Sequence, residues 1–168
     1  MYDFQFSDPA FATHTLLRQA WIAVNKAVEY RLAKVGLTPE KLAVLWACRD
    51  YPGTLFPAEI ARLLFREEQS VTGLLNRMER DGLIKRIPRR KRKPFVEVKI
   101  TPKGEEAMSP ALPVHKELIE ELASDLSAEQ QENLQDSLRA LRDKALETLR
   151  LEPRPAGGRP GKAFALKW

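Results

Sequence analysis

The sequence has few of the residues that catalysis and metal binding use most often. It holds one cysteine, Cys48, and two histidines, His14 and His115, among 168 residues. A single cysteine excludes an intramolecular disulfide and fits a reducing compartment. Neither histidine stands near a cluster of cysteine or carboxylate residues at ligand spacing, so we expect no metal site and no cofactor. Because no nucleophile stands beside a base and no nucleotide-binding loop is present, we expect a protein that is not an enzyme.

Long apolar runs are also missing. No segment approaches the ~20 residues that a membrane-spanning helix needs. The first residues, Met1-Tyr2-Asp3-Phe4, lack the basic region of a signal peptide. The chain is 43% hydrophobic and 30% charged, which suits a globular core with a solvated surface. We therefore expect a cytoplasmic protein with no membrane partner.

Positive charge is present in excess and is gathered in one place. The formal net charge is +5, and the run Arg89-Arg90-Lys91-Arg92-Lys93 accounts for most of it. A net positive charge favours an anionic partner such as nucleic acid. By itself such a run is equally typical of a solvated loop or of a site for any polyanion. Its place between two expected strands favours contact with DNA.

Capping residues and prolines place the first four helices. Asp8 and Thr38 suit the cap position, and a proline follows each of them at the first helical position. Gly36 ends the first helix. The expected helices start at Pro9, Pro39, Pro57 and Gln69, and three of them end near Lys34, Cys48 and Arg80.

The second half of the chain begins with two short segments typical of a β-hairpin. Residues 83–87 and 95–100 are the expected strands, and the cationic run is the loop between them. Thr101 caps a fifth helix, which Pro110 and Pro113 should kink or divide. A capping box at Ser127 starts a last helix that runs to about Arg150. Residues 152–168 are rich in proline and glycine, and we expect a flexible basic tail there.

The expected fourth helix has the composition of a DNA-reading helix. It carries polar residues among apolar ones: Ser70, Thr72, Asn76 and Arg77 alternate with Val71, Leu74, Leu75 and Met78. Such a helix can present side chains to base edges in the major groove. A cationic hairpin behind it can neutralise phosphates and release counterions. Together these elements indicate a winged helix-turn-helix.

The order and spacing of several motifs resemble those of the MarR family of bacterial and archaeal regulators. The matching residues are Ile60-Ala61, Ser70-Val71-Thr72, Leu74, Arg77, Gly82-Leu83 and Ile100-Thr101-Pro102-Lys103-Gly104. The resemblance covers roughly residues 10 to 150. It implies a mainly α fold with a small β-hairpin wing. Residues 36–101 would form the winged helix-turn-helix domain, and residues 8–35 and 102–151 a helical dimerisation region.

The resemblance also implies site residues. The residues it implies for DNA binding are Ser70, Thr72, Gly73, Asn76, Arg77, Arg89, Arg90, Lys91, Arg92 and Lys93. Family members often have an effector pocket between the dimerisation and DNA-binding parts. In this sequence, the residues on the elements that would line this pocket are His14, Arg18, Trp21, Trp46 and Tyr51. Aromatic rings with an arginine suit an anionic aromatic ligand, although ordinary packing explains the same residues equally well.

The sequence departs from the family pattern at several places, among them Arg66 at a leucine-like position and the weak cap Glu67-Glu68-Gln69. Phe65 stands in the turn where the family usually has a small residue, often glycine. Gly73 stands where the family often has arginine; it permits close approach to DNA or is simply tolerated. The family's wing often pairs an aspartate with an arginine, and this chain has Arg92-Lys93-Pro94 there. Without that aspartate, we expect a wing arginine to lack an internal partner and the wing to bind more by charge.

The leading hypothesis is a homodimeric repressor on a palindromic operator, released by a small aromatic or phenolic ligand. One alternative is an architectural protein of low sequence specificity; a regulator should favour its site by at least ~10³ over random duplex. A second alternative is a redox-sensing regulator that uses Cys48. That function requires a lowered thiol pKa, whereas a lone cysteine in an apolar helix is usually a buried small hydrophobe.

Overall fold

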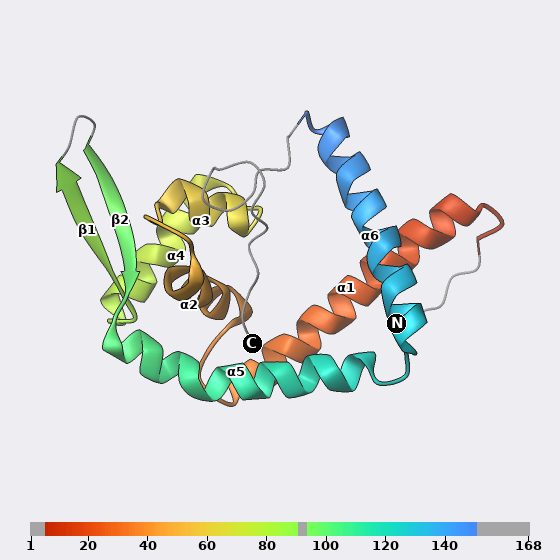
Figure 1. The fold of residues 1–168 in the computed structure, drawn as a ribbon, viewed down its shortest axis with the longest axis horizontal. Helices are drawn as coiled ribbons and strands as arrows, with labels where there is room; N and C mark the ends of the chain where they lie inside the picture. Colours follow the sequence, from red (N-terminus) through yellow and green to blue (C-terminus); the bar gives the residue numbers. More distant parts are fainter. Residues whose placement is uncertain (1–5, 91–93, 151–168) are drawn as a thin grey trace.

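The computed structural model describes residues 6–90 and 94–150. Within these residues the chain forms six helices and one antiparallel hairpin, so the architecture is mainly α (Figure 1). The order and type of the elements confirm the predicted fold class. In chain order the elements are α1 (Pro9–Ala33), α2 (Pro39–Asp50), α3 (Pro57–Leu63), α4 (Glu68–Arg80), β1 (Ile84–Arg90), β2 (Pro94–Ile100), α5 (Pro102–Ala123) and α6 (Ala128–Thr148).

Local capping sets the starts of four helices. The side chains of Asp8, Thr38 and Thr101 each accept a hydrogen bond from a backbone amide in the first turn of α1, α2 and α5. At α6, Ser127 and Gln130 form the predicted capping box, with bonds of 2.8 and 3.2 Å. Each cap satisfies amides that no helical carbonyl can reach. The predicted helix starts at these four positions are therefore confirmed.

One hydrophobic core joins α2, α3, α4, the hairpin, α5 and the end of α1. Figure 1 shows α2, α3 and α4 enclosed between the hairpin and α5. Gly104 allows the start of α5 to lie against this core, because a Cβ there would stand 2.2 Å from the Leu83 carbonyl oxygen. The largest fully buried side chains are Leu32, Leu45, Ile60, Leu75, Met78, Ile84, Met108, Val44, Val71 and Val98.

The hairpin is longer than its alternating pattern predicts. Its register runs from Ile84 opposite Ile100 to Arg90 opposite Pro94. The expectation that Arg89 and Arg90 lie in the loop is therefore wrong, since both belong to β1. Pro88 does not end the strand, because β1 is an edge strand in which a missing amide can face outward.

Both prolines of α5 lie inside one continuous helix. Pro110 and Pro113 fall within Pro102–Ala123, so the expected division of this helix is wrong. The ribbon of α5 bends along its length, as the alternative of a kink predicts (Figure 1). Both prolines are exposed, and water can therefore bond the carbonyl groups that lose their amide partners.

The outer half of α1 and all of α6 project from this core (Figure 1). Val28 and Leu32, near the end of α1, are the buried residues of that helix, and α6, which is described in full, buries none. None of the described helices is both long and apolar enough to cross a membrane. The exposed large apolar residues of the two helices are Phe11, Leu16, Leu17, Trp21, Val24, Tyr30, Leu134, Leu138 and Leu141.

Candidate nucleic-acid interface

Helix α4 turns one polar face to solvent. Its buried side is formed by Val71, Leu74, Leu75 and Met78. Successive helical residues are about 100° apart, so the centre of the opposite side is occupied by a second set of residues. This set, which we call the outward strip, consists of Gln69, Gly73, Asn76 and Arg80.

The predicted α4 residues all reach this surface. Ser70, Thr72, Asn76 and Arg77 are exposed, and Gly73 is partly exposed. Sequence reasoning missed Gln69 and Arg80, which are exposed on the outward strip. A helical projection of α4 around its buried residues would have found them.

The two flanks of the outward strip differ in their surroundings. Thr72 donates its hydroxyl hydrogen to the Glu68 carbonyl oxygen of its own helix, at 2.8 Å. Ser70 and Arg77, on the other flank, line a cavity of about 320 Å³ between α4 and the start of α2. The other residues that line this cavity are Thr38, Glu40, Lys41, Arg66, Val71 and Leu74.

Two cations beside this cavity are held by carboxylates. Lys41 pairs with Asp81 at 2.9 Å, which ties α2 to the end of α4. Arg66 pairs with Glu40 at 3.0 Å, which ties the turn before α4 to α2. The hydrogen bond and charge of Lys41 lower the pKa of Asp81 below its ordinary value. These pairs fix the start and end of α4 against α2.

The turn before α4 contains a residue in an unfavourable backbone conformation. Phe65 has a φ of 52°, in the left-handed region that favours glycine. Its side chain is 67% exposed, so packing of the ring offers little compensation. Glu67 follows as the cap residue of α4 and makes no side-chain cap bond. The start of α4 is therefore less well stabilised than the starts of the capped helices.

Glu79 joins α4 to the wing. Its carboxylate accepts hydrogen bonds from the Arg86 backbone amide at 2.9 Å and from the Arg86 Nε at 2.8 Å. The Arg86 Nη2 atom lies 2.6 Å from the same carboxylate. These hydrogen bonds lower the pKa of Glu79 below its ordinary value. The end of α4 and the start of β1 are thus fixed to each other.

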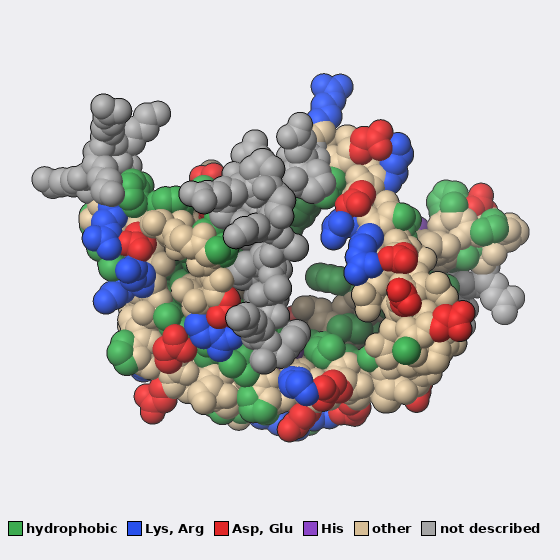
Figure 2. All heavy atoms as spheres, in the orientation of Figure 1, with side chains coloured by type: hydrophobic (Ala, Val, Ile, Leu, Met, Phe, Trp, Pro, Cys, Tyr) green, Lys and Arg blue, Asp and Glu red, His purple; other side chains and the backbone are tan. Residues whose placement is uncertain are grey.

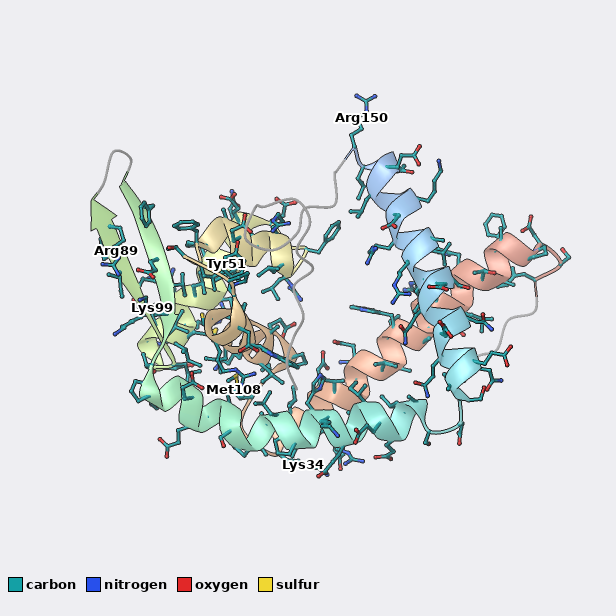
Figure 3. All side chains as sticks on the ribbon, in the orientation of Figure 1. Lys34, Tyr51, Arg89, Lys99, Met108 and Arg150 are labelled. Carbon is teal, nitrogen blue, oxygen red and sulfur yellow. The ribbon has the colours of Figure 1, made fainter. Side chains whose placement is uncertain are left out.

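A second carboxylate orients an arginine of the wing. Glu97 on β2 is 9% exposed, and its Oε2 atom accepts from Arg89 Nε at 2.7 Å, with Nη2 at 2.6 Å. Lys99 Nζ lies 3.3 Å from the other carboxylate oxygen. The Arg89 hydrogen bond holds the pKa of Glu97 below its ordinary value. Figure 3 shows Arg89 and Lys99 on the side of the hairpin away from the core.

The expectation that the wing arginines lack an internal acidic partner is therefore wrong for Arg89. Glu97 supplies that partner from the opposite strand. Arg89 faces Phe95 in the register, and Glu97 lies two residues further along the same face. The alternation of β1 would have revealed this pair if the strand had been extended to Arg90.

Three of the predicted DNA-binding residues of the wing fall outside the described part of the chain. Lys91, Arg92 and Lys93, and the expected tail 152–168, lie outside the described residues. Arg90 is described only as the end of β1. Figure 2 shows lysine and arginine side chains along the outer edge of the hairpin. The described part of the wing thus already carries positive charge beside α4.

Comparisons with known proteins agree with this geometry. Residues 35–93 match the sequence model of the MarR family. The matched segment, from the start of α2 to the hairpin, is thus similar to the MarR family. No curated protein sequence matches it.

Solved structures of MarR-family and other regulators share the fold. The ligand-free form of the organohalide-sensing regulator RdhR-CbdbA1625 has a TM-score of 0.72 and 23% identity, covering 90% of this chain and 98% of that one. BldR from Sulfolobus solfataricus has a TM-score of 0.68 and 25% identity, covering 84% and 99%. The S. aureus MepR–DNA complex has a TM-score of 0.71 and 23% identity, covering 82% and 99%.

Three of the expected effector residues lie on the outer half of α1. His14, Arg18 and Trp21 are exposed there. At about 1.5 Å per residue, His14 stands roughly 27 Å along the helix from the buried Leu32. Within one chain these three side chains therefore do not meet the core.

The other two expected effector residues lie in α2 and at its C-terminal cap. Trp46 is buried, and its ring meets that of His115 edge-on, with 6.4 Å between centroids. The Tyr51 hydroxyl donates to Glu59 at 2.9 Å, and Figure 3 shows Tyr51 near α3. The five residues are thus not brought together in a single chain.

The environment of Cys48 opposes a redox function. Burial, with a smaller contribution from the charge of Glu105, raises the thiol pKa to about 12. The thiolate is the reactive form, so very little of it is present near neutral pH. Among the described residues, no group of three or more histidine, cysteine or acidic residues could hold a metal ion.

Proposed function

We propose that this chain is a sequence-specific DNA-binding transcriptional regulator of the MarR family. The supporting observation is that α4 exposes a polar strip and is fixed by Glu79 to the basic strand β1. A helix held in this way can enter the major groove while the hairpin contacts the phosphate backbone. MepR, which has a similar fold, has been solved as a complex with DNA.

We propose that the chain binds DNA as a homodimer. The exposed large apolar residues of α1 and α6 have 39–66% of their surface accessible, and such apolar faces normally pack against a partner. A second copy supplies a matching surface, because a two-fold interface uses the same residues on both chains. Two recognition helices would then read half-sites about 34–36 Å apart on a palindromic operator.

We further propose that the protein represses transcription and that a small aromatic or phenolic ligand relieves this repression. RdhR-CbdbA1625, at 25% identity and a TM-score of 0.69, has been solved with 2,4-dichlorophenol bound. In a dimer, α1 of one copy can approach the second copy, so the exposed Trp21 gains surroundings that one chain lacks. Such a ligand releases DNA only if it binds more tightly to the DNA-free arrangement.

The test starts from selection of duplexes by the full-length protein from a random library at physiological salt. We expect a near-palindromic sequence, bound at least ~10³-fold more tightly than random duplex, by a particle of two chains. A ratio far below this value would favour the architectural alternative. Asn76→Ala should lower the ratio, whereas Glu106→Ala on the far side of α5 is the matched control.

A further inference from the structure

Gly73 occupies the middle of the outward strip of α4. It is the sixth residue of a helix that runs from Glu68 to Arg80, so it belongs to the helix interior. A glycine in the interior weakens a helix relative to alanine. The question is therefore why this position carries no side chain.

The folded chain by itself does not require a glycine at position 73. The φ angle of Gly73 is not positive, whereas Gly36, Gly53 and Gly82 have positive φ. A Cβ at Gly73 would meet only Arg77 Nη1, at 3.7 Å, which is an ordinary van der Waals contact. The contrast is Gly104, where a Cβ would clash with the Leu83 carbonyl oxygen at 2.2 Å.

The fold does not require a glycine at position 73, whereas a partner that approaches this surface closely would. We propose that Gly73 is the point at which the backbone of α4 approaches the DNA most closely. Glycine allows such an approach because no Cβ separates the backbone from the ligand. This inference rests on the proposed function, and it adds a position that acts through the absence of a side chain.

The neighbours of Gly73 fit this role. Asn76 is a short side chain on the same strip, and it reaches base edges only if the helix lies deep in the groove. The Arg77 guanidinium lies beside the position that a Cβ at residue 73 would take. A larger side chain at position 73 would therefore lift the helix and shorten the reach of Asn76 to the base edges.

The decisive variants are Gly73→Ala and Gly73→Val in the full-length protein. Binding is measured to the duplex selected by the wild type and to random duplex, across a series of salt concentrations. We expect Gly73→Ala to raise the melting temperature and to weaken binding to the selected duplex at least tenfold. Gly73→Val should weaken binding further, because the obstruction grows with side-chain size.

Salt dependence separates this steric effect from the loss of a charge contact. A lost phosphate contact lowers the slope of log K against log salt by about one. We expect the slope of Gly73→Ala to equal that of the wild type. Ser109→Ala, an exposed helical position on α5, is the matched control and should leave affinity unchanged.

Three outcomes would overturn the inference. Unchanged affinity in Gly73→Ala would mean that DNA does not approach this backbone. A lower melting temperature would mean that the fold itself needs the glycine. A slope reduced by one would assign the loss to a displaced cation such as Arg77. A wild type that selects no sequence is a different result, and it would overturn the proposed function together with this inference.

Discussion

The carboxylate of Glu79 accepts hydrogen bonds from both the backbone amide and the guanidinium of Arg86, at 2.9 and 2.8 Å. One side chain thus fixes α4 and the first strand of the hairpin to each other. In the proposed function both elements contact DNA at the same time, and they gain affinity from being held in place beforehand.

Glu79→Gln tests this connection. The variant keeps the size of the side chain and loses its charge, so the bonds from Arg86 weaken. We expect the free energy of unfolding to fall by less than about 1 kcal/mol, since the pair is partly exposed. We also expect affinity for the selected duplex to fall, and to fall by more than this small loss of folding stability accounts for. Thermal melting and DNA titration on the same sample measure both quantities, and equal affinity in the two proteins would contradict the prediction.

Glu97→Gln tests the orientation of Arg89. Without the carboxylate, Arg89 is no longer held, and the wing loses one negative charge near the phosphates. We expect tighter binding to random duplex and a smaller ratio of specific to non-specific affinity. Glu106→Gln removes the same charge from an exposed position of α5 and is the control. A ratio that stays constant would show that Arg89 does not depend on Glu97 for specific binding.

The same carboxylate should affect the dependence of stability on pH. The folded pKa of Glu97 is lowered below 4.5 by Arg89. The pair therefore contributes stability above the unfolded value, and this contribution is lost as the pH falls through the folded value. We expect the wild type to lose more stability than Glu97→Gln when the pH falls below about 4.5. Denaturant titrations of both proteins between neutral and acid pH measure the difference.

Phe65→Gly tests the strain in the turn before α4. At a φ of 52°, a residue with a Cβ is disfavoured by roughly 1–2 kcal/mol relative to the right-handed region. Glycine removes this cost and adds entropy to the unfolded chain, so we expect a modest rise in melting temperature. Phe65→Ala is the matched control, since it removes the ring and keeps the Cβ. Equal melting temperatures for the two variants would contradict strain as the cause.

Leu138→Glu tests the dimer surface. Leu138 is 39% exposed on α6, and a buried charge at an interface between two copies is strongly unfavourable. We expect the variant to be a monomer that keeps its helical content and loses affinity for a two-half-site duplex. Light scattering after size-exclusion chromatography gives the mass. A variant that remains dimeric would place the interface elsewhere.

Cys48 should be inert at neutral pH. Its folded pKa of about 12 lies above the ordinary value of 9.0. The unfolded chain therefore loses the thiol proton first as the pH rises, and stability falls between these two values by up to ~1.4 kcal/mol per pH unit. We expect Cys48→Ala to show a flatter decline above pH 9 than the wild type. Fast reaction of the native protein with a thiol reagent at neutral pH would contradict this environment.

The sequence by itself determined the element order and most boundaries. Asp8, Thr38, Thr101 and Ser127 cap helices through bonds to amides two or three residues away. Such information is local, so a sequence pattern reveals it. The polar face of α4 was predictable for the same reason, because it follows from the helical period.

Only the tertiary structure decided the contacts between elements. Glu79 meets Arg86 across a turn, and Glu97 meets Arg89 across a hairpin whose register no single strand specifies. Pro88 continues a strand, contrary to its propensity, because pairing along β1 and β2 outweighs local preference. The role of Gly73 likewise needed three dimensions, since only the space around a missing Cβ shows whether the fold or a partner requires its absence.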